Sequence, residues 1–238
     1  LVVIEDNKKD AIKNLKRYSD IFTVVEVETK YPQGGEKQLI KAATGREVPS
    51  GGLPFQAGVV VANVGTCAQI AKSLSTGIPL VERVVTVTGK YLKSPKNLKA
   101  KIGTYFKDLI EECGGLTGGE IKKVVSGGPM MGFAVPSLEI PIVKGTSGIL
   151  VFSDKEVLVQ SPVNCTRCAR CVDVCPMSLL PDLIADYAEQ DKFDKAEKLG
   201  AMDCIECGAC SYVCGSKRNI VQLIKLAKSE ILKKRAKK

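Results

Sequence analysis

The chain has 238 residues, of which 45% are hydrophobic, so it is long enough to bury a core in one large domain or in two to three small ones. It contains no histidine, which excludes Ser–His and Cys–His nucleophile systems, Rieske-type clusters and His-containing zinc sites. The net charge is +9, and no apolar run approaches the roughly 20 residues that span a bilayer, so we expect a soluble or peripheral protein.

The first residues predict a strand–helix–strand unit. The apolar run Leu1–Ile4 reads as a strand cut out of a larger protein, so we expect the chain to be a fragment. Asp6 or Asn7 is a suitable N-cap for a helix over residues 11–18, where the apolar side chains follow helical spacing. A strand over residues 22–27 follows, and such a unit is typical of a parallel α/β sheet.

The next segment alternates loops and short elements. Loops rich in Gly and Pro are predicted over residues 31–36 and 49–54, with a short helix over residues 38–43 between them. Residues 59–64 are mainly apolar and predict a buried strand, which a helix over residues 65–74 follows. These elements continue the α/β pattern.

A second module begins near Pro79 with a β-branched strand over residues 81–88. Thr104 is a plausible N-cap for a helix that runs to Cys113 and is closed by Gly114-Gly115. We expect a small α+β unit in which strands pack on this one helix. Its other elements are a strand over residues 121–126, a turn-rich loop over residues 127–132 and short strands within residues 140–160.

The character of the chain changes at Ser161, where helical patterns begin. Apolar stripes predict helices over residues 179–187 and, after a break at Gln190-Asp191, over residues 193–199. A last stripe covers residues 220–231. We expect these stripes to form the core of a helical C-terminal domain, not of a compact β-rich ferredoxin.

Eight of the ten cysteines form two copies of the spacing Cys-x2-Cys-x2-Cys-x3-Cys, the run that holds [4Fe–4S] clusters in bacterial ferredoxins. Pro176 follows the first copy, whereas Gly215 follows the second. The remaining Cys67 and Cys113 stand alone, as expected of small buried hydrophobic residues. The predicted metal ligands are Cys165, Cys168, Cys171, Cys175, Cys204, Cys207, Cys210 and Cys214.

We expect ligation to be crossed between the two motifs, because in such pairs the fourth cysteine of each run binds the other cluster. Two zinc ions are the alternative metal, although this spacing is not that of zinc knuckles. Disulfides are the alternative without metal, and neighbouring cysteines two residues apart suit them poorly. The first cluster then takes Cys165, Cys168, Cys171 and Cys214, and the second takes Cys175, Cys204, Cys207 and Cys210.

Much of the positive charge lies in the C-terminal tail. The simplest interpretation is a solvated helix end. The alternatives are attraction to anionic lipid head groups or to an acidic electron-carrier partner. Nucleic acid is a third option, which the lack of interleaved aromatic residues disfavours. The cations concerned are Lys233, Lys234, Arg235, Lys237 and Lys238.

Three features of the sequence point to one family. The segment Val124–Gly132 reads Val-Val-Ser-Gly-Gly-Pro-Met-Met-Gly, the twin cysteine motif has a helical spacer and ends in Cys204–Gly208, and residues 1–78 have an α/β pattern. Together they resemble the C subunit of the Rnf electron-transport complex, an ion-pumping ferredoxin:NAD oxidoreductase. The first feature resembles the signature of its soluble-ligand-binding β-grasp (SLBB) module. The third resembles the flavin-binding domain shared with the 51-kDa subunit of respiratory complex I.

The resemblance implies a fold of three parts. They are a partial, Rossmann-like α/β flavoprotein domain, an α+β β-grasp (SLBB-like) module with connecting strands, and a helical dicluster ferredoxin-type domain. The predicted boundaries are residues 1–78, 79–160 and 161–238.

The flavin residues also come from the resemblance. Here the patterns Tyr-x-x-Gly-Gly-Glu and Asn-Val-x-Thr are similar to flavin and nicotinamide contacts of the complex I protein, although Ala62 stands where that family has a further Asn. From the residues alone, a simple turn and a strand-end cap explain them as well. The Gly-rich phosphate-binding loop would lie upstream, so we expect this fragment to lack a complete NADH site. The implied cofactor-binding residues are Tyr31, Gly34, Gly35, Glu36, Asn63 and Thr66.

The resemblance implies an electron-transfer subunit of a membrane-associated, ion-translocating oxidoreductase complex. Its cofactors would be two [4Fe–4S] clusters, with FMN and NAD(H) in the full-length protein. Its partners would be the other subunits and a ferredoxin-type electron carrier, with peripheral membrane contact and no nucleic acid. We would place it in the cytoplasm, on the inner face of a bacterial cell membrane. No residue is assigned a catalytic acid–base role.

Two other functions fit the same pattern. A cobalamin reductase of the propanediol-utilisation type has a similar architecture. Corrinoid binding by the full-length protein, without membrane association, would favour it. The second is a non-catalytic ferredoxin-like adaptor whose β-grasp module binds a ligand or partner. The absence of NADH-linked flavin reduction in the full-length protein would favour that function.

Overall fold

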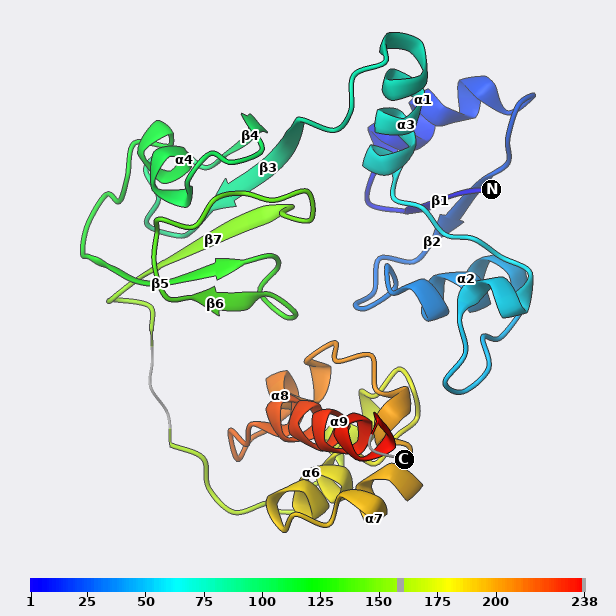
Figure 1. Cartoon of the computed structure of the whole chain (residues 1–238), viewed down its shortest axis with the longest axis vertical. Coiled ribbons are helices and arrows are strands. Elements are labelled where there is room, and N and C mark those ends of the chain that lie inside the picture. Colours follow the sequence, from blue (N-terminus) through cyan, green and yellow to red (C-terminus); the bar gives the residue numbers. More distant parts are fainter. Residues whose placement is uncertain (158–160, 237–238) are drawn as a thin grey trace. The chain divides into compact units, whose positions relative to one another are not determined.

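The computed structural model describes residues 1–157 and 161–236 of the chain. Figure 1 labels its main helices and strands. The chain divides into two units, each with its own internal contacts. Unit 1 consists of Leu1–Ala62, Cys165–Cys214 and Asn219–Lys238, and unit 2 consists of Asn63–Asn164 and Gly215–Arg218.

Unit 1 begins with the predicted strand–helix–strand unit. β1 (Val2–Glu5) pairs in parallel with β2 (Val24–Val27), and α1 (Lys9–Leu15) with the 3-10 helix η1 (Lys16–Tyr18) connects them. Parallel strands require such a crossover, because a tight turn cannot join them. The α/β character predicted for the first residues is confirmed.

The N-cap predicted for α1 is wrong. Lys8 occupies that position without a side-chain cap, and Asp6 instead accepts hydrogen bonds from the backbone N of Thr29 at 3.1 Å and from its Oγ1 at 2.6 Å. These bonds lower the pKa of the Asp6 carboxyl, with the hydroxyl bond the main cause. Asp6 therefore connects the end of β1 to the segment that follows β2. The local sequence does not show which of the two hydrogen-bonding roles, helix cap or partner of Thr29, its side chain takes.

The predicted helix after the first loop is present as α2 (Glu36–Thr44), which ends at Gly45 with a left-handed φ of 72°. The strand predicted at residues 59–64 is wrong. Val60 is 86% exposed, and Asn63 accepts a hydrogen bond from Gly65 N at 2.9 Å. A buried strand needs neighbouring strands, and an apolar run does not show whether they exist. Asn63 caps α3 (Val64–Thr76), the helix predicted next, which belongs to unit 2.

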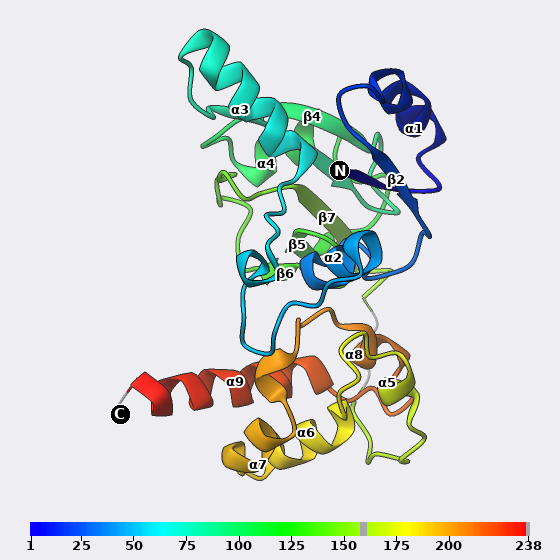
Figure 2. The ribbon, with the colours of Figure 1, turned by 90° about the vertical axis from the view of Figure 1, so that its right-hand side faces the viewer.

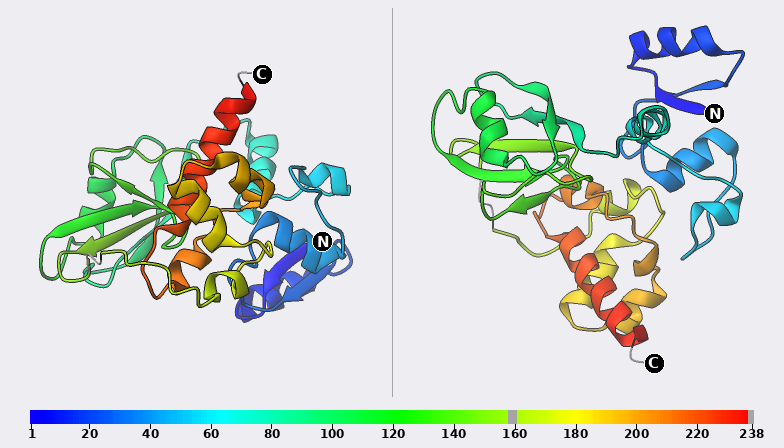
Figure 3. Two further views of the ribbon diagram at one scale, coloured as in Figure 1. Left: turned by 90° about the horizontal axis from the view of Figure 1, so that it is seen from below. Right: turned by 45° about the horizontal axis from the view of Figure 1, so that its top comes forward.

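The rest of unit 1 is helical. α9 (Ile220–Ala236) packs against α6 (Pro181–Glu189) and α7 (Phe193–Lys198), as Figures 2 and 3 show. Two short helices, α5 (Arg170–Asp173) and α8 (Ala209–Val213), belong to the cysteine motifs and contact each other. The predicted helical domain is confirmed, and burial of its apolar stripes stabilises it. Its most deeply buried side chains include Ile184, Ala185, Ala196, Ile224, Ala227 and Ile231.

The described cations of the tail make ion pairs within unit 1. Lys234 and Arg235 bind Asp194 and Glu197 of α7 at 2.5 Å each. Exposed pairs of this kind contribute about 0–1 kcal/mol each to stability. Part of the charge considered for lipid or partner binding is thus engaged by the chain itself. The remaining predicted cations, Lys237 and Lys238, lie outside the described residues.

Unit 2 contains a five-stranded mixed sheet with the order β4-β3-β7-β5-β6. β3 and β7 run parallel, and the other neighbours are antiparallel. The positions of β3, β5 and β7 agree with the predicted strands, whereas β4 and β6 were not predicted. The strands are β3 (Glu82–Thr88), β4 (Lys96–Lys101), β5 (Ile121–Ser126), β6 (Phe133–Val135) and β7 (Gly148–Ser153).

The core of unit 2 lies between the sheet and α4 (Phe106–Glu112). Phe106 is buried in one cluster with Val85 and Val87 of β3, whereas the neighbouring Val84 is 61% exposed. Alternate side chains of a strand point to opposite faces, so only one face of β3 enters this core. The predicted packing of strands on one helix is confirmed.

The ends of α4 agree only in part with the prediction. Thr104 does not cap the helix, because its Oγ1 donates to the carbonyl of Lys101 at 2.8 Å and Tyr105 occupies the N-cap. Gly114 and Gly115 follow the helix with left-handed φ values of 80° and 66°. The predicted closure by glycine is confirmed, since glycine adopts this conformation without steric cost.

Candidate metal centre

The two cysteine motifs repeat one backbone conformation. Cys204 lies 39 residues after Cys165 (204 − 165 = 39), and three further pairs of residues at that interval share a positive φ. This conformation is strained for a non-glycine residue, so it persists where the surrounding structure requires it. The pairs are Arg167 and Glu206 at 54° and 58°, Ala169 and Gly208 at 61° and 82°, and Ser178 and Lys217 at 52° and 53°.

The strained turns direct backbone N–H groups at sulfur. Arg167 N donates to Cys165 Sγ at 3.4 Å, and the equivalent Glu206 N donates to Cys204 Sγ at 3.3 Å. A further backbone N–H reaches Cys175 Sγ at 3.4 Å. Such donors stabilise thiolate ligands and tune the reduction potential of an iron–sulfur cluster.

Four cysteines from both motifs line one small cavity inside unit 1. They are Cys175 of the first motif and Cys204, Cys207 and Cys210 of the second. This is the set that crossed ligation predicts for the second cluster. The set is all thiol and the surrounding wall is apolar, which suits a cluster held by four Cys. The wall includes Leu179, Pro181, Ile205, Val221 and Ile224.

Two of the thiols that line the cavity have raised pKa values, mainly because they are buried. Burial raises the pKa of Cys210 to about 12, and the charge of Cys204 adds to this effect. Burial also raises the pKa of Cys204, to which Cys175 and Cys207 contribute as like charges. Thiols held together in this way lose their protons when they bind metal.

The other four predicted ligands do not line this cavity. Cys171 is buried, and burial together with the charge of Asp182 raises the pKa of its thiol, with a small contribution from Cys165. Cys168 is exposed, and the N–H of Arg170 lowers its pKa. Among the described residues, no three His, Cys, Asp or Glu side chains are close enough to hold a single metal ion. The thiolates of a cubane cluster bind different irons, so a cluster does not require such a group.

A lysine that the sequence did not single out lies beside the second ligand set. Lys228 Nζ donates to the carbonyl of Cys204 at 2.9 Å and to Glu206 Oε1 at 2.5 Å. Its side chain is only 19% exposed. Lys228 on α9 therefore binds both ends of the strained turn, a contact across 24 residues for which the sequence has no local signal.

The residues implied for flavin binding fall in two units. Tyr31 and the Gly34-Gly35-Glu36 turn belong to unit 1, where the Tyr31 hydroxyl donates to the carbonyl of Cys207 at 2.5 Å. A Cβ on Gly34 would meet open space, whereas a Cβ on Gly35 would lie 2.6 Å from the side chain of Gln38. One side of the turn is therefore open and the other is closely packed. The remaining two, Asn63 and Thr66, lie at the start of α3 in unit 2.

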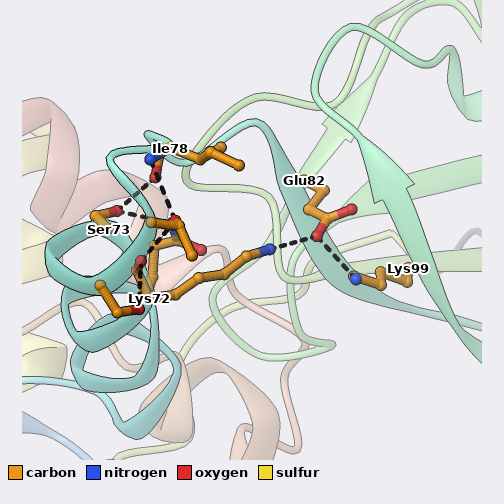
Figure 4. Close-up of polar contacts among 8 residues, drawn as sticks. Lys72, Ser73, Ile78, Glu82 and Lys99 are labelled. Atoms are coloured by element: carbon orange, nitrogen blue, oxygen red, sulfur yellow. Dashed lines mark hydrogen bonds and ion pairs between the residues drawn. The ribbon is translucent and has the colours of Figure 1, made fainter.

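Unit 2 has a large open cavity of about 1010 Å³ between α3 and the β3–β4 edge of its sheet. Figure 4 shows Lys72 of α3 and Lys99 of β4 converging on Glu82 of β3, each at 2.8 Å. These hydrogen bonds lower the pKa of Glu82 to about 2. The charged groups at this point satisfy one another, and the rest of the lining is mainly apolar.

Three family models match successive parts of the chain. They describe the Nuo51 FMN-binding domain at residues 1–72, the SLBB domain at residues 84–134 and a 4Fe-4S dicluster domain at residues 157–215. These matches confirm the predicted fold class. They also confirm iron–sulfur clusters and FMN as the cofactors of such domains. The individual ligand and flavin residues stay predictions.

Relatives align with nearly the whole chain. It is 51% identical over 237 residues to the C subunit of the Na(+)-translocating ferredoxin:NAD(+) oxidoreductase complex of Acetobacterium woodii, covering 98% of this chain and 53% of the relative. The C subunit of the proton-translocating complex of Clostridium ljungdahlii is 49% identical, covering 96% and 50%. The C subunit of an ion-translocating oxidoreductase complex of Pseudomonas aeruginosa is 41% identical, covering 100% and 31%. The chain thus spans about half the length of the first two.

Proposed function

The chain belongs to the family of C subunits of ion-translocating ferredoxin:NAD(+) oxidoreductase complexes, and on this premise we propose that its protein transfers electrons within such a complex. The observation that supports this most directly is the all-thiol cavity to which both cysteine motifs contribute. Two [4Fe–4S] clusters held by the eight motif cysteines would pass electrons singly between a two-electron carrier and the next protein of the complex. The protein is then an oxidoreductase and translocase subunit of the NADH:ferredoxin type.

The residues of this chain would hold the clusters and tune them. Crossed ligation assigns Cys165, Cys168, Cys171 and Cys214 to one cluster. It assigns Cys175, Cys204, Cys207 and Cys210, which line the cavity, to the other. Backbone N–H groups on the strained turns donate to Sγ of Cys165 and Cys204, which would favour the reduced state of a cluster bound there. FMN bound in the full-length protein would supply the exchange between hydride and single electrons. Tyr31, Gly34, Gly35, Glu36, Asn63 and Thr66 are proposed to contribute to its site.

The proposed partners are the other subunits of the complex and a ferredoxin-type electron carrier. We place the protein on the cytoplasmic side, in peripheral contact with the inner face of a bacterial cell membrane. No helix in the described part of the chain is long and apolar enough to cross a membrane. The proposed division into domains is at residues 78/79 and 160/161.

The test uses the full-length protein after anaerobic reconstitution with iron and sulfide. We expect about eight iron and eight acid-labile sulfide atoms per chain, electron paramagnetic resonance (EPR) signals of two interacting clusters, and reduction of bound flavin by NADH. Zinc without sulfide would contradict the cluster assignment. Loaded clusters combined with corrinoid binding and no membrane association would instead indicate a cobalamin reductase. Loaded clusters without NADH-linked flavin reduction would indicate a non-catalytic ferredoxin-like adaptor.

A further inference from the structure

Lys228 of α9 makes two hydrogen bonds to the turn between Cys204 and Glu206. Its Nζ donates to the carbonyl of Cys204 at 2.9 Å and to Glu206 Oε1 at 2.5 Å. The backbone N–H of Glu206 in turn donates to Cys204 Sγ at 3.3 Å. All three residues belong to unit 1, so these contacts lie within one compact unit. An ion pair is therefore attached directly to the turn that carries a predicted cluster ligand.

This ion pair is partly buried. The Lys228 side chain is 19% exposed, whereas the neighbouring Lys225 is 48% exposed and reaches Glu206 Oε2 only at 3.7 Å. Solvent and salt screen a partly buried charge less than an exposed one. Burial raises the pKa of the Cys204 thiol, and the N–H of Glu206 and the charge of Lys228 act in the opposite direction. The charge of Lys228 thus favours negative charge on this sulfur.

The pair is not part of the framework that the two cysteine motifs share. α6 begins 39 residues before α9 (220 − 181 = 39), the same interval that separates the two motifs. Arg167 stands in the first motif where the second has Glu206. Glu189 stands in α6 where α9 has Lys228, so the signs of both charges are exchanged. The N–H donor to sulfur is the same in both turns, and the charges beside them differ.

We propose that the Lys228–Glu206 pair sets the reduction potential of the cluster that Cys204 binds, with Lys228 raising the potential and Glu206 lowering it. This inference rests on the proposed function, which supplies the cluster. It holds whether or not ligation is crossed, because Cys204 binds the second cluster in either case. Lys228 is a positioning residue, because it acts on the cluster through the Cys204 turn.

The direction of each effect follows from the charge of the cluster. Reduction adds one electron, from the 2+ to the 1+ state, and neither forms nor breaks a covalent bond. A nearby cation stabilises the more negative, reduced state, and a nearby anion destabilises it. For one partly buried charge we expect an effect on the order of tenfold in the ratio of reduced to oxidised cluster, which is about 59 mV for one electron.

The test is a redox titration of the reconstituted full-length protein with chemical mediators, followed by EPR. Cys204→Ser identifies the signal of the second cluster. At a fixed potential, Lys228→Met should lower the ratio of reduced to oxidised second cluster by about tenfold. Glu206→Gln should raise that ratio by about the same factor, because its amide oxygen can still accept the Lys228 hydrogen bond while the negative charge is gone.

Two further variants are the controls. Lys228→Arg keeps the positive charge, and Lys225→Met removes a more exposed one, so both should leave the ratio within about twofold of the parent. The first cluster should stay within about twofold in every variant.

Shifts of opposite sign in Lys228→Met and Glu206→Gln would support the proposal, because loss of a merely structural contact would move both potentials in one direction or neither. Shifts of the same sign, no shift, or shifts confined to the first cluster would overturn it. If Lys228→Met binds no cluster, Glu206→Gln decides by itself: a raised potential supports the proposal and an unchanged one overturns it. The mediators reduce the clusters without NADH, so an unreactive flavin would contradict the proposed function and leave this result intact. A parent protein that binds zinc without sulfide would contradict both.

Discussion

At the scale of single residues, Lys228 offers a test of how the turn from Cys204 to Glu206 is held. Its ammonium binds the Cys204 carbonyl and the Glu206 carboxylate, whereas the more exposed Lys225 reaches Glu206 only at 3.7 Å. We expect Lys228→Met to lower the free energy of unfolding by about 1–3 kcal/mol, because it leaves two partly buried acceptors without their donor. Lys225→Met should cost less than about 0.5 kcal/mol. Urea unfolding at neutral pH measures both, and equal losses would contradict the role of Lys228.

Gly34 and Gly35, in the turn that the resemblance links to flavin binding, form a second matched pair. A Cβ on Gly35 would lie 2.6 Å from Gln38 Oε1 and 3.0 Å from the Pro32 carbonyl, whereas a Cβ on Gly34 would have no atom within 4 Å. We expect Gly35→Ala to lower the free energy of unfolding by about 1–2 kcal/mol, since the backbone carbonyl cannot easily move. Gly34→Ala should stay within about 0.5 kcal/mol of the parent. Thermal unfolding followed by circular dichroism distinguishes them, and a larger loss at Gly34 would show that the turn is packed differently.

What the sequence predicts at this scale depends on how local the interaction is. The eight cysteines follow from spacing alone, because each cluster motif is contained in a few residues. The hydrogen bond from Tyr31 to Cys207 joins residues 176 positions apart, so no local sequence pattern predicts it. The N-caps expected at Asp6 and Thr104 failed for a related reason: each side chain found another hydrogen-bond partner.

At the scale of elements, the turn between β5 and β6 requires glycine at residue 132. A Cβ on Gly132 would lie 2.5 Å from the Gly128 carbonyl and 2.5 Å from Val125 Cγ1, whereas Gly128 has no atom within 4 Å of its Cβ position. We expect Gly132→Ala to destabilise unit 2 by about 1–3 kcal/mol. Gly128→Ala should have an effect within about 0.5 kcal/mol. Urea unfolding of both variants is the measurement, and an unaffected Gly132→Ala protein would contradict this turn geometry.

The contact between α3 and the sheet predicts a pH dependence. Hydrogen bonds from Lys72 and Lys99 hold the pKa of Glu82 at about 2, below its ordinary 4.5. A carboxyl with a depressed pKa stabilises the fold above pH 4.5, and this contribution is lost as the pH falls through 2. The stability difference between the parent and Glu82→Gln should therefore be constant near neutral pH and shrink between about pH 4.5 and 2. Urea midpoints across this range test it.

Glu139→Gln is the control for that series. Among the described residues Glu139 pairs with Lys107 alone, at 3.4 Å, so its replacement should leave a small effect at every pH. If the Glu82→Gln difference persisted unchanged at about pH 2.5, the ion-pair account of the α3 contact would be wrong.

Helices and strands could be predicted from the sequence where their side chains follow a clear periodic pattern and other elements cover their apolar face. β3 and the helices of the cysteine region show clear periodicity and are present. β4 carries Lys at three of its six positions and β6 has only three residues, so neither shows a strong strand signal. Both lie at the edges of the sheet, where charged and short strands are common.

At the scale of the whole molecule, the predicted metal ligands and the sheet core belong to different units. All eight predicted ligands lie in unit 1, where Cys171 and Cys210 are part of the buried helical cluster. Unit 2 has a separate apolar core built from β3, α4, β5 and β7. Crossed ligation would tie residues 165–175 to residues 204–214, so the clusters should act as cross-links within the helical part.

This division predicts that loss of iron destabilises one unit only. Removing the clusters with a chelator under oxidising conditions should leave buried thiols such as Cys210 without ligands, and the loops around them lose their cross-link. Amide hydrogen exchange should therefore accelerate in α6 and α9, which share the core with Cys210. Exchange in β3 and β7 should stay unchanged, because their core contains none of the eight ligands. Mass spectrometry of loaded and cluster-free protein measures both regions at once. Equal acceleration throughout would mean that the two units unfold together and that the clusters stabilise the chain as a whole.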